Sequence, residues 1–253
     1  MRRWGRLGFW YRLGIAILVP PTRLLTRREQ SGVELVPPGG VLVAANHISL
    51  VDPVVLCDFV LCGLGRAPRF LAKSEMFVGG GLVPRVMRGA GQIPVDRAAA
   101  DASRALDAAV AALERGDTVV IYPEGTVTKD PARWPTVART GVARLALLSG
   151  APVVPVAQWG AHALAPRLLG GLRPPRRHLV RFRVGPPVDL SRWRGRELTA
   201  QVLREATEAV MAAVTGELEV LRGEARPPRT PAARDNLRGR AAGYDDRQRE
   251  ETA

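Results

Sequence analysis

Short apolar runs rich in valine alternate with longer stretches of helical periodicity through the middle of this sequence. Runs with the pattern of buried strands occupy residues 41–45, 92–95, 118–122, 153–157 and 179–184. Stretches with apolar residues at helical spacing occupy residues 53–61, 101–113, 138–148 and 198–221. Strands that are apolar throughout are buried on both faces, and the intervening helices are the elements that cover them. The alternation therefore predicts an α/β fold with a mostly parallel or mixed central sheet flanked by helices.

The composition agrees with a folded domain and narrows the class of partner. The chain has 253 residues, of which 46% are hydrophobic and 24% charged, so wholesale disorder is excluded. Its two cysteines, Cys57 and Cys62, cannot form a disulfide framework, and a cysteine-based zinc site is not expected. A net charge of +13 and a pI of about 11.2 indicate an anionic partner. Nucleic acid, an anionic membrane surface and a phosphorylated substrate all satisfy this condition.

Residues 1–30 combine basic, aromatic and apolar side chains. They contain seven arginines and one acidic residue, and four aromatic residues precede the apolar run: Trp4, Phe9, Trp10 and Tyr11. The run at residues 13–19 is far shorter than the roughly 20 residues that span a bilayer. This combination is typical of helices that lie in a membrane surface, which we expect here. An ordinary packed helix is the main alternative, whereas a signal peptide would end in small residues instead of Pro20-Pro21.

Two other stretches differ from the rest of the chain. Residues 223–253 lack apolar periodicity and mix prolines with charges of both signs, so we predict a disordered charged tail. Residues 167–183 are rich in arginine, and a solvated surface explains them better than an edge that faces lipid headgroups. The sequence thus divides into an interfacial segment, a domain at residues 31–222 and the tail.

The first predicted strand ends in a histidine that is followed by an aspartate. The sequence there is Asn46-His47-Ile48-Ser49-Leu50-Val51-Asp52-Pro53. In open α/β sheets, ligands bind at the carboxyl ends of the strands. An imidazole with a pKa near 6.5 suits proton transfer there, and an aspartate five residues on can hold its second nitrogen. A core histidine, and Asp52 as the N-cap of the following helix, are the competing interpretations.

Two other strand ends carry residues that suit a phosphate-bearing ligand. Strand 118–122 runs into Pro123-Glu124-Gly125-Thr126, where the glycine permits close approach of a ligand and the threonine offers a hydroxyl. Strand 92–95 is followed by Arg97, whose guanidinium can bind phosphate through two hydrogen bonds. An ordinary Pro-Gly turn and a surface pair between Asp96 and Arg97 are the simpler explanations.

These elements, in this order, resemble the glycerolipid acyltransferase family, in particular the 1-acyl-glycerol-3-phosphate (lysophosphatidic acid) acyltransferases. The residues that match motifs of that family are Asn46, His47 and Asp52 (N-H-x-x-x-x-D), Gly91 and Arg97, Pro123 to Thr126 (P-E-G-T), and the V-P-V strand around Pro155. The similarity spans residues 41–157 and extends more weakly to about residue 190. Many relatives carry an arginine directly after E-G-T, whereas this chain has Val127. Lys129 and Arg139 are the candidates for the missing charge.

The resemblance implies the glycerol-3-phosphate acyltransferase-like fold and a division of labour in the site. His47 is implied as the general base and Asp52 as its orienting partner. Four residues are implied around the glycerophosphate of the acceptor: Arg97, Glu124, Gly125 and Thr126. The implied reaction moves a fatty acyl group from an acyl thioester to the free hydroxyl of a lysophospholipid. With 1-acyl-sn-glycerol-3-phosphate as acceptor, the product is phosphatidic acid for phospholipid biosynthesis.

The resemblance also implies partners and location. The acyl donor is a co-substrate, acyl-CoA or acyl-ACP (acyl carrier protein), and no metal or redox cofactor is implied. Membrane lipids are the implied partners, with the enzyme at the cytoplasmic face of the cell membrane as a peripheral or monotopic protein. Nucleic acid is not expected as a partner, because the chain holds no recognisable nucleic-acid module. The sequence does not indicate an oligomeric state.

Alternatives concern the nucleophile and the acceptor. Direct attack of the lipid hydroxyl is expected because the chain has no G-x-S-x-G sequence. Ser49 lies close to His47 in an ordinary loop, and Cys57 falls in the following helix, where it is expected to be core. Acylation of another lipid or glycolipid hydroxyl, and a catalytically inert membrane lipid-binding protein, are the alternative functions.

Overall fold

The computed structural model describes residues 7–95, 99–164 and 177–228, with residues 99–104 described by their backbone alone. The chain divides into two units, Met1–Gly223 and Glu224–Ala253, and the fold described below belongs to the first. Residues 229–253, the larger part of the predicted disordered tail, lie outside the described residues. The last helix ends at Arg222 and is followed by Gly223, which adopts a φ of 73°.

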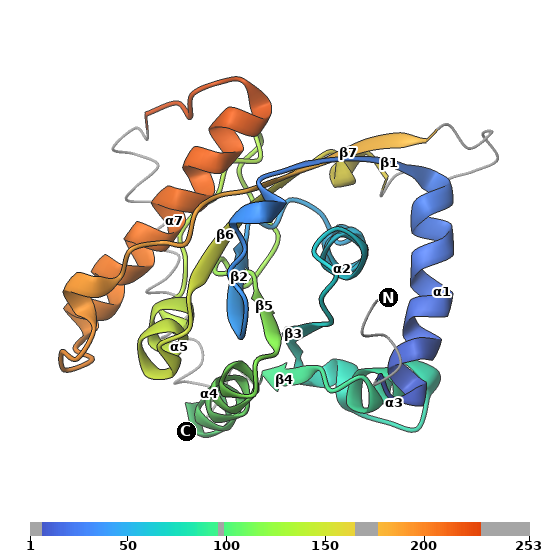
Figure 1. Cartoon of the computed structure of the whole chain (residues 1–253), viewed down its shortest axis with the longest axis horizontal. Coiled ribbons are helices and arrows are strands. Elements are labelled where there is room, and N and C mark those ends of the chain that lie inside the picture. Colours follow the sequence, from blue (N-terminus) through green and yellow to red (C-terminus); the bar gives the residue numbers. More distant parts are fainter. Residues whose placement is uncertain (1–6, 96–98, 165–176, 229–253) are drawn as a thin grey trace, which may run out of the picture. The chain divides into compact units, whose positions relative to one another are not determined.

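A seven-stranded sheet forms the centre of the first unit (Figure 1). Its strands are β1 (Thr26–Ser31), β2 (Val41–Ala45), β3 (Pro68–Lys73), β4 (Ile93–Val95), β5 (Thr118–Ile121), β6 (Val153–Trp159) and β7 (His178–Val184). They lie in the order β1-β7-β6-β2-β5-β3-β4. Neighbouring strands are parallel, except that β6 and β7 are antiparallel. The prediction of a mostly parallel or mixed sheet is confirmed.

Helices cover both faces of the sheet, as the uniformly apolar strands predict. Leu42, Ala44 and Val119 pack on one face with apolar residues of α4 (Ala99–Glu114), α5 (Gly141–Ser149) and α7 (Ala200–Arg222). Val43 and Val120 point to the other face and pack with α2 (Asp52–Cys62). Successive strand residues alternate between faces, so β2 supplies both cores, and all five of its side chains are buried.

The N-terminal segment is helical only in part. Helix α1 covers Phe9–Leu25, and residues 26–31 leave the helix to form β1, which pairs in parallel with β7. The boundary predicted at residue 30 therefore falls inside a strand of the sheet. The sequence hides this strand because it lies at the sheet edge, where only Thr26 is buried and the other side chains are polar.

Two ion pairs join this segment to the rest of the fold. Asp58 of α2 is buried, and its carboxylate oxygens lie 3.3 Å from Arg23 Nε and 2.9 Å from Arg28 Nη1. Arg23 belongs to α1 and Arg28 to β1. The first helix and the first strand are thus fixed to the same helix that begins at Asp52. In the described part of the chain, no helix is both long and apolar enough to cross a membrane.

Strand β3 and helix α3 (Leu82–Gly89) were not predicted. Most side chains of β3 are half-buried, so it lacks the apolar run that marks a central strand. Helix α3 packs against α1, as Figure 1 shows. Glycines make this contact possible, because a Cβ at Gly89 would overlap the ring of Trp10, and a Cβ at Gly14 would lie 3.2 Å from Val86 Cγ1.

The second arginine-rich stretch is described only at its end. Residues 165–176 lie outside the described residues, and the rest reaches into β7. There the arginines alternate with buried apolar residues, as predicted for a strand with one polar face. Arg183 Nε lies 2.6 Å from Glu217 Oε2 on α7.

Candidate active site

Three neighbouring parallel strands bring the predicted site residues to one edge of the sheet. β2 lies between β5 and β6, and all three run in the same direction. His47 follows β2, the Pro123–Thr126 turn follows β5, and Gln158 and Trp159 end β6. The sheet itself therefore places the turn and the histidine side by side, although they are far apart in the sequence.

His47 and Asp52 form the pair that the sequence predicted. His47 Nδ1 lies 2.9 Å from Asp52 Oδ2, and the aspartate is fully buried. The same oxygen accepts hydrogen bonds from the backbone N–H groups of Ile48 (2.5 Å) and Ser49 (2.8 Å). Because Nδ1–H donates to the carboxylate, Nε2 is left as the basic nitrogen of the ring.

Asp52 is not the N-cap of α2, so the competing interpretation of this residue is wrong. Val51 is the residue that precedes α2, and Asp52 is the first residue of the helix. Its carboxylate folds back over the preceding loop and makes the bonds to His47, Ile48 and Ser49. A single carboxylate thus orients the imidazole and holds the shape of the loop that carries it.

The ring of Tyr122 supports the imidazole from one side. The two rings are stacked, with centroids 4.2 Å apart and planes 18° apart. Burial raises the pKa of Tyr122 well above its usual value, so the side chain is a neutral phenol at physiological pH. Stacking on one face and the bond to Asp52 at one edge fix the position of the imidazole.

Glu124 is buried, and both of its oxygens have partners within the protein. Oε1 accepts from the backbone N–H of His47 (3.2 Å), and Oε2 accepts from the N–H (2.8 Å) and hydroxyl (3.1 Å) of Thr136. Burial raises the pKa of Glu124, and these hydrogen bonds act in the opposite direction. In this structure Glu124 joins the loop of His47 to the loop after β5. A contact between Glu124 and the acceptor stays a prediction.

The turn at Gly125 is exposed to solvent. Gly125 has a φ of 68°, a conformation that favours glycine, and both Gly125 and Thr126 are exposed. The side chain of Arg139 lies over this turn, since a Cβ at Gly125 would be 3.1 Å from Arg139 Nε. The N–H of Arg139 donates to Pro123 O (2.8 Å), and α5 begins at Gly141, later than the predicted residue 138. Of the two basic residues suggested by the sequence, Arg139 is the one seen beside the turn.

Arg97 cannot be placed relative to the other site residues. Residues 96–98 lie outside the described residues, so neither the predicted phosphate contact nor the surface pair with Asp96 is tested. Strand β4, which leads to it, ends at Val95 and lies at the edge of the sheet beside β3. The assignment of Arg97 to the acceptor stays a prediction.

The sequence analysis did not identify the residues that hold the loop after β5 in place. The N–H of Thr128 donates to His47 O (2.7 Å), and the Thr128 hydroxyl donates to Trp134 O (2.7 Å). The guanidinium of Arg222 lies over two indole rings, 4.0 Å from the centroid of Trp134 and 4.1 Å from that of Trp159. Arg222 Nη1 also donates to Ala132 O (2.7 Å). The last residue of α7 thus fixes this loop against the end of β6.

A second missed residue is Gln158, which pairs with Asn46 of the first motif. Asn46 Nδ2 donates to Gln158 O (3.1 Å), and Gln158 donates from its N–H to Asn46 Oδ1 and from Nε2 to Asn46 O (both 2.8 Å). Both residues are fully buried. The signal in the sequence was a polar residue, Gln158, directly after the apolar run at residues 153–157. These bonds continue the pairing of β2 and β6 up to His47.

The other candidate nucleophiles are held in unreactive settings. Ser49 is buried, and its hydroxyl oxygen accepts from the N–H of Val51 (3.2 Å). Burial raises the pKa of the Cys57 thiol to about 12, so it is protonated at physiological pH. Among the residues that the structure describes, no group of three or more His, Cys, Asp or Glu side chains is arranged to hold a metal ion.

Comparisons with known proteins give one family match and a similar solved structure. A family model described as Acyltransferase matches residues 27–159, just over half of the chain, and this range contains all the motif residues. The crystal structure of the 1-acyl-sn-glycerophosphate (LPA) acyltransferase PlsC from Thermotoga maritima is similar, with a TM-score of 0.59 and 26% sequence identity. The similarity covers 87% of this chain and 80% of that chain. No curated protein matches the sequence.

Proposed function

The chain belongs to the Acyltransferase family, and from this premise we propose that it acylates the free hydroxyl of a lysophospholipid. The acceptor that we favour is 1-acyl-sn-glycerol-3-phosphate, which gives phosphatidic acid. The observation that carries the proposal is the 2.9 Å contact between His47 Nδ1 and Asp52 Oδ2 at the sheet edge that also holds the Pro123–Thr126 turn. The Thermotoga maritima relative is an LPA acyltransferase, which supports the choice of acceptor.

In the proposed reaction, His47 acts as the general base. Nε2 takes the proton of the lipid hydroxyl while the hydroxyl oxygen attacks the carbonyl carbon of the acyl thioester. The tetrahedral intermediate then collapses, the C–S bond breaks, and the thiolate recovers the proton from the imidazolium. Asp52 stabilises the imidazolium and keeps Nδ1 protonated throughout. A general base of this kind contributes about 10² to 10⁴ in rate.

The phosphate of the acceptor requires positive charge near the turn. We assign the exposed guanidinium of Arg139, which lies over Gly125, and the hydroxyl of Thr126 to this role. Arg97 joins them on the basis of its sequence motif. Arg139 comes from a different part of the loop than the arginine that Val127 replaces, so it offers charge at the turn without restoring the family sequence.

The donor, cofactors and location are part of the same proposal. The donor is an acyl thioester, acyl-CoA or acyl-ACP, and the chemistry at His47 uses no metal or redox cofactor. The protein acts as a peripheral or monotopic enzyme at the cytoplasmic face of the cell membrane, with helix α1 in contact with lipid. The exposed Phe9, Ile17 and Leu24 of α1 support this placement.

Acylation of a different lipid or glycolipid hydroxyl is the second candidate, and Val127 is the observation that favours it. A panel of acceptors with one acyl-CoA donor, with products identified by mass spectrometry, separates the candidates. We expect phosphatidic acid from 1-acyl-sn-glycerol-3-phosphate in preference to products from lysophosphatidylcholine or a glycolipid. Absence of acyl transfer to every acceptor, in a protein that still binds lipid vesicles, would show an inert lipid-binding protein instead.

A further inference from the structure

A stretch of nine residues after β3 contains no charged side chain. It runs Met76-Phe77-Val78-Gly79-Gly80-Gly81-Leu82-Val83-Pro84, from the end of the short helix η3 (Ser74–Phe77) through the first turn of α3. We refer to residues 76–84 as the apolar loop. Four of its large hydrophobic side chains are exposed: Met76, Val78, Leu82 and Val83. A Cβ at Gly79 or Gly80 would meet no atom within 4 Å, so the glycines stand away from the fold.

The apolar loop is exposed and yet fixed in place. Val78 is 73% exposed and Val83 is 58% exposed, although both are β-branched apolar residues of the kind that fills cores. The guanidinium of Arg88 on α3 donates to the carbonyl oxygens of Phe77 and Gly79. Contiguous exposed apolar residues mark a surface that contacts a partner or a membrane. Here the backbone that presents them is already shaped.

Two arginines follow the apolar loop on α3, and the exposed Glu75 precedes it. Arg85 and Arg88 of α3 are exposed, and so is Arg12 of α1. The helices are in contact, because Gly89 makes room for the ring of Trp10. Apolar side chains beside arginines match the boundary between acyl chains and anionic headgroups. A second copy of the chain would bring the same arginines and meet like charge.

The apolar loop also lies at the edge of the sheet that carries the site. It follows the carboxyl end of β3, and β3 is parallel to β5, which is parallel to β2. His47 follows β2 at this same edge, and Leu50 in its loop is 83% exposed. A bilayer in contact with the apolar loop therefore lies on the side of the molecule where His47 lies.

We propose that the apolar loop inserts into the surface of an anionic lipid bilayer, next to α1. Val78, Leu82 and Val83 enter the region of the first acyl carbons, and Arg85 and Arg88 face the headgroups. This contact is separate from the chemistry at His47 and holds for any lipid substrate.

Vesicle sedimentation of the full chain tests the proposal. The variant carries Val78→Asp and Leu82→Asp, two changes at exposed positions that leave the core untouched. Leu148→Asp is the matched control, because Leu148 is 51% exposed on α5, outside the apolar loop. With vesicles of phosphatidylglycerol and phosphatidylcholine, we expect the double variant to bind at least about tenfold more weakly than the wild type and the control.

Two further measurements make the outcome decisive. A Val83→Trp variant should show a blue-shifted emission and quenching by brominated lipid when vesicles are added. Equal vesicle binding by the double variant and the wild type would overturn the proposal. A lipid-free dimer that the double variant converts to a monomer would also overturn it, because the partner would then be a second copy. Vesicle binding is read without acyl transfer, so an inactive wild type that binds through the loop contradicts the proposed function alone.

Discussion

The backbone N–H of His47 donates to Oε1 of Glu124 at 3.2 Å, and this bond joins the ends of two neighbouring strands. The other oxygen of the same carboxylate holds Thr136, further along the loop after β5. Glu124 therefore holds the backbone of the histidine, whereas Asp52 holds its ring. This relationship gives the glutamate a positioning role that is separate from any contact with substrate.

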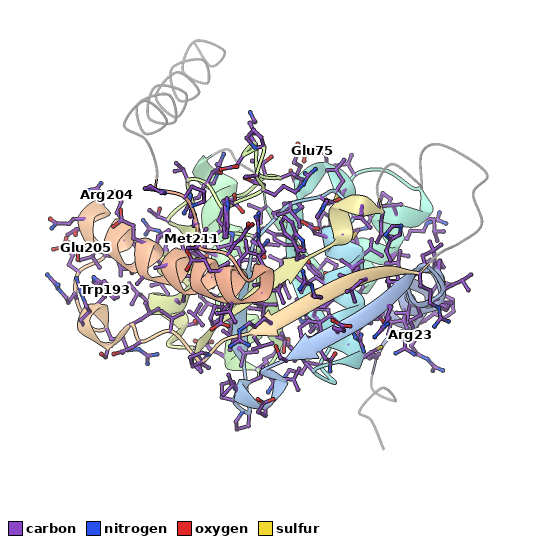
Figure 2. All side chains as sticks on the ribbon, turned by 90° about the horizontal axis from the view of Figure 1, so that it is seen from above. Arg23, Glu75, Trp193, Arg204, Glu205 and Met211 are labelled. Carbon is purple, nitrogen blue, oxygen red and sulfur yellow. The ribbon has the colours of Figure 1, made fainter. Side chains whose placement is uncertain are left out.

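Replacing Glu124 with glutamine should lower kcat by about 10-fold to 100-fold with little change in KM. The amide would turn an NH₂ donor toward the N–H of His47 or of Thr136, and an unmet buried donor costs about 1–3 kcal/mol. Steady-state kinetics and thermal unfolding measure the two effects. Glu75→Gln is the control, because Glu75 is exposed in η3 and labelled in Figure 2. A Glu124→Gln variant with the kcat of the wild type would contradict the role.

The stability that depends on Glu124 should fall as pH rises. Burial raises its pKa in the folded state above the ordinary value of 4.5, so the folded protein holds the proton more tightly than the unfolded chain does. The contribution is complete below about pH 4.5 and is lost as pH passes the folded pKa. Urea unfolding of the wild type and of Glu124→Gln, at pH values from 4.5 upward, isolates this contribution. A difference between the two proteins that does not change with pH would contradict it.

His47→Ala should lower acyl transfer by about 10² to 10⁴ while the protein stays folded. Asp52→Asn should lower kcat as well, because the amide no longer stabilises the imidazolium. Radiolabelled acyl transfer and thermal unfolding measure activity and folding. His178→Ala is the control. His178 is one of the three histidines of the chain, and it lies in β7, which β6 separates from β2. A fully active His47→Ala variant would remove the mechanism.

Arg139→Ala should raise KM for a phosphate-bearing acceptor by about tenfold and leave KM for the acyl donor unchanged. A charge-assisted hydrogen bond contributes about 1.5–3 kcal/mol, which corresponds to that factor or more. Arg97→Ala should act in the same direction. Lys129→Ala is the comparison, and it should change KM less because the structure places Arg139 at the turn. A collapse of donor binding with an unchanged acceptor KM would mean that the two ends of the site are reversed.

Arg222→Leu should lower kcat by about tenfold at temperatures well below unfolding. The change removes two cation–π contacts and the bond to Ala132 O, and it frees the loop that carries Thr128 and Thr136. Arg222→Lys should restore part of the activity. Equal KM values in the variant and the wild type, with reduced kcat, separate a loss of positioning from a loss of substrate binding.

Arg192→Leu provides the matched control for this experiment. Arg192 lies 4.3 Å from the ring of Trp193, so its removal also deletes a cation–π contact. Figure 2 shows Trp193 and Glu205 near the beginning of α7, and Arg222 ends that helix roughly 30 Å away. Arg192→Leu should keep the kcat of the wild type. A similar loss of kcat in both variants would show a general effect on stability.

The central part of the fold was predictable because its strands carry an unusually simple pattern. β2, β5 and β6 are apolar at nearly every position, and this pattern follows from burial on both faces. β1 and β3 were not predicted, because a strand at the edge or a half-exposed strand need not be apolar at every position. Their pairing depends on β7 and β5, which are distant in the sequence.

The chemistry of the site was more predictable than its support. His47 and Asp52 are five residues apart, so one loop brings them together, and the 2.9 Å contact confirms their pairing. The contacts of Arg222 with Trp134 and Trp159 join a loop, a helix end and a strand end. No local pattern encodes such a contact. The same holds for the bond between Glu124 and Thr136, because the shape of the loop between them decides it.

The parallel pairing of β1 with β7 has a practical consequence for attempts to obtain a shorter, more soluble form of the protein. Removing residues 1–31 would delete β1 as well as the apolar helix α1. Strand β7 would then lose its outer neighbour along the whole paired stretch, from Thr26–His178 to Ser31–Arg183. The unpaired amide and carbonyl groups of β7 would then form an exposed sheet edge that can pair with strands of other chains. A truncation that begins after α1, and keeps β1, spares the protein from that route to aggregation.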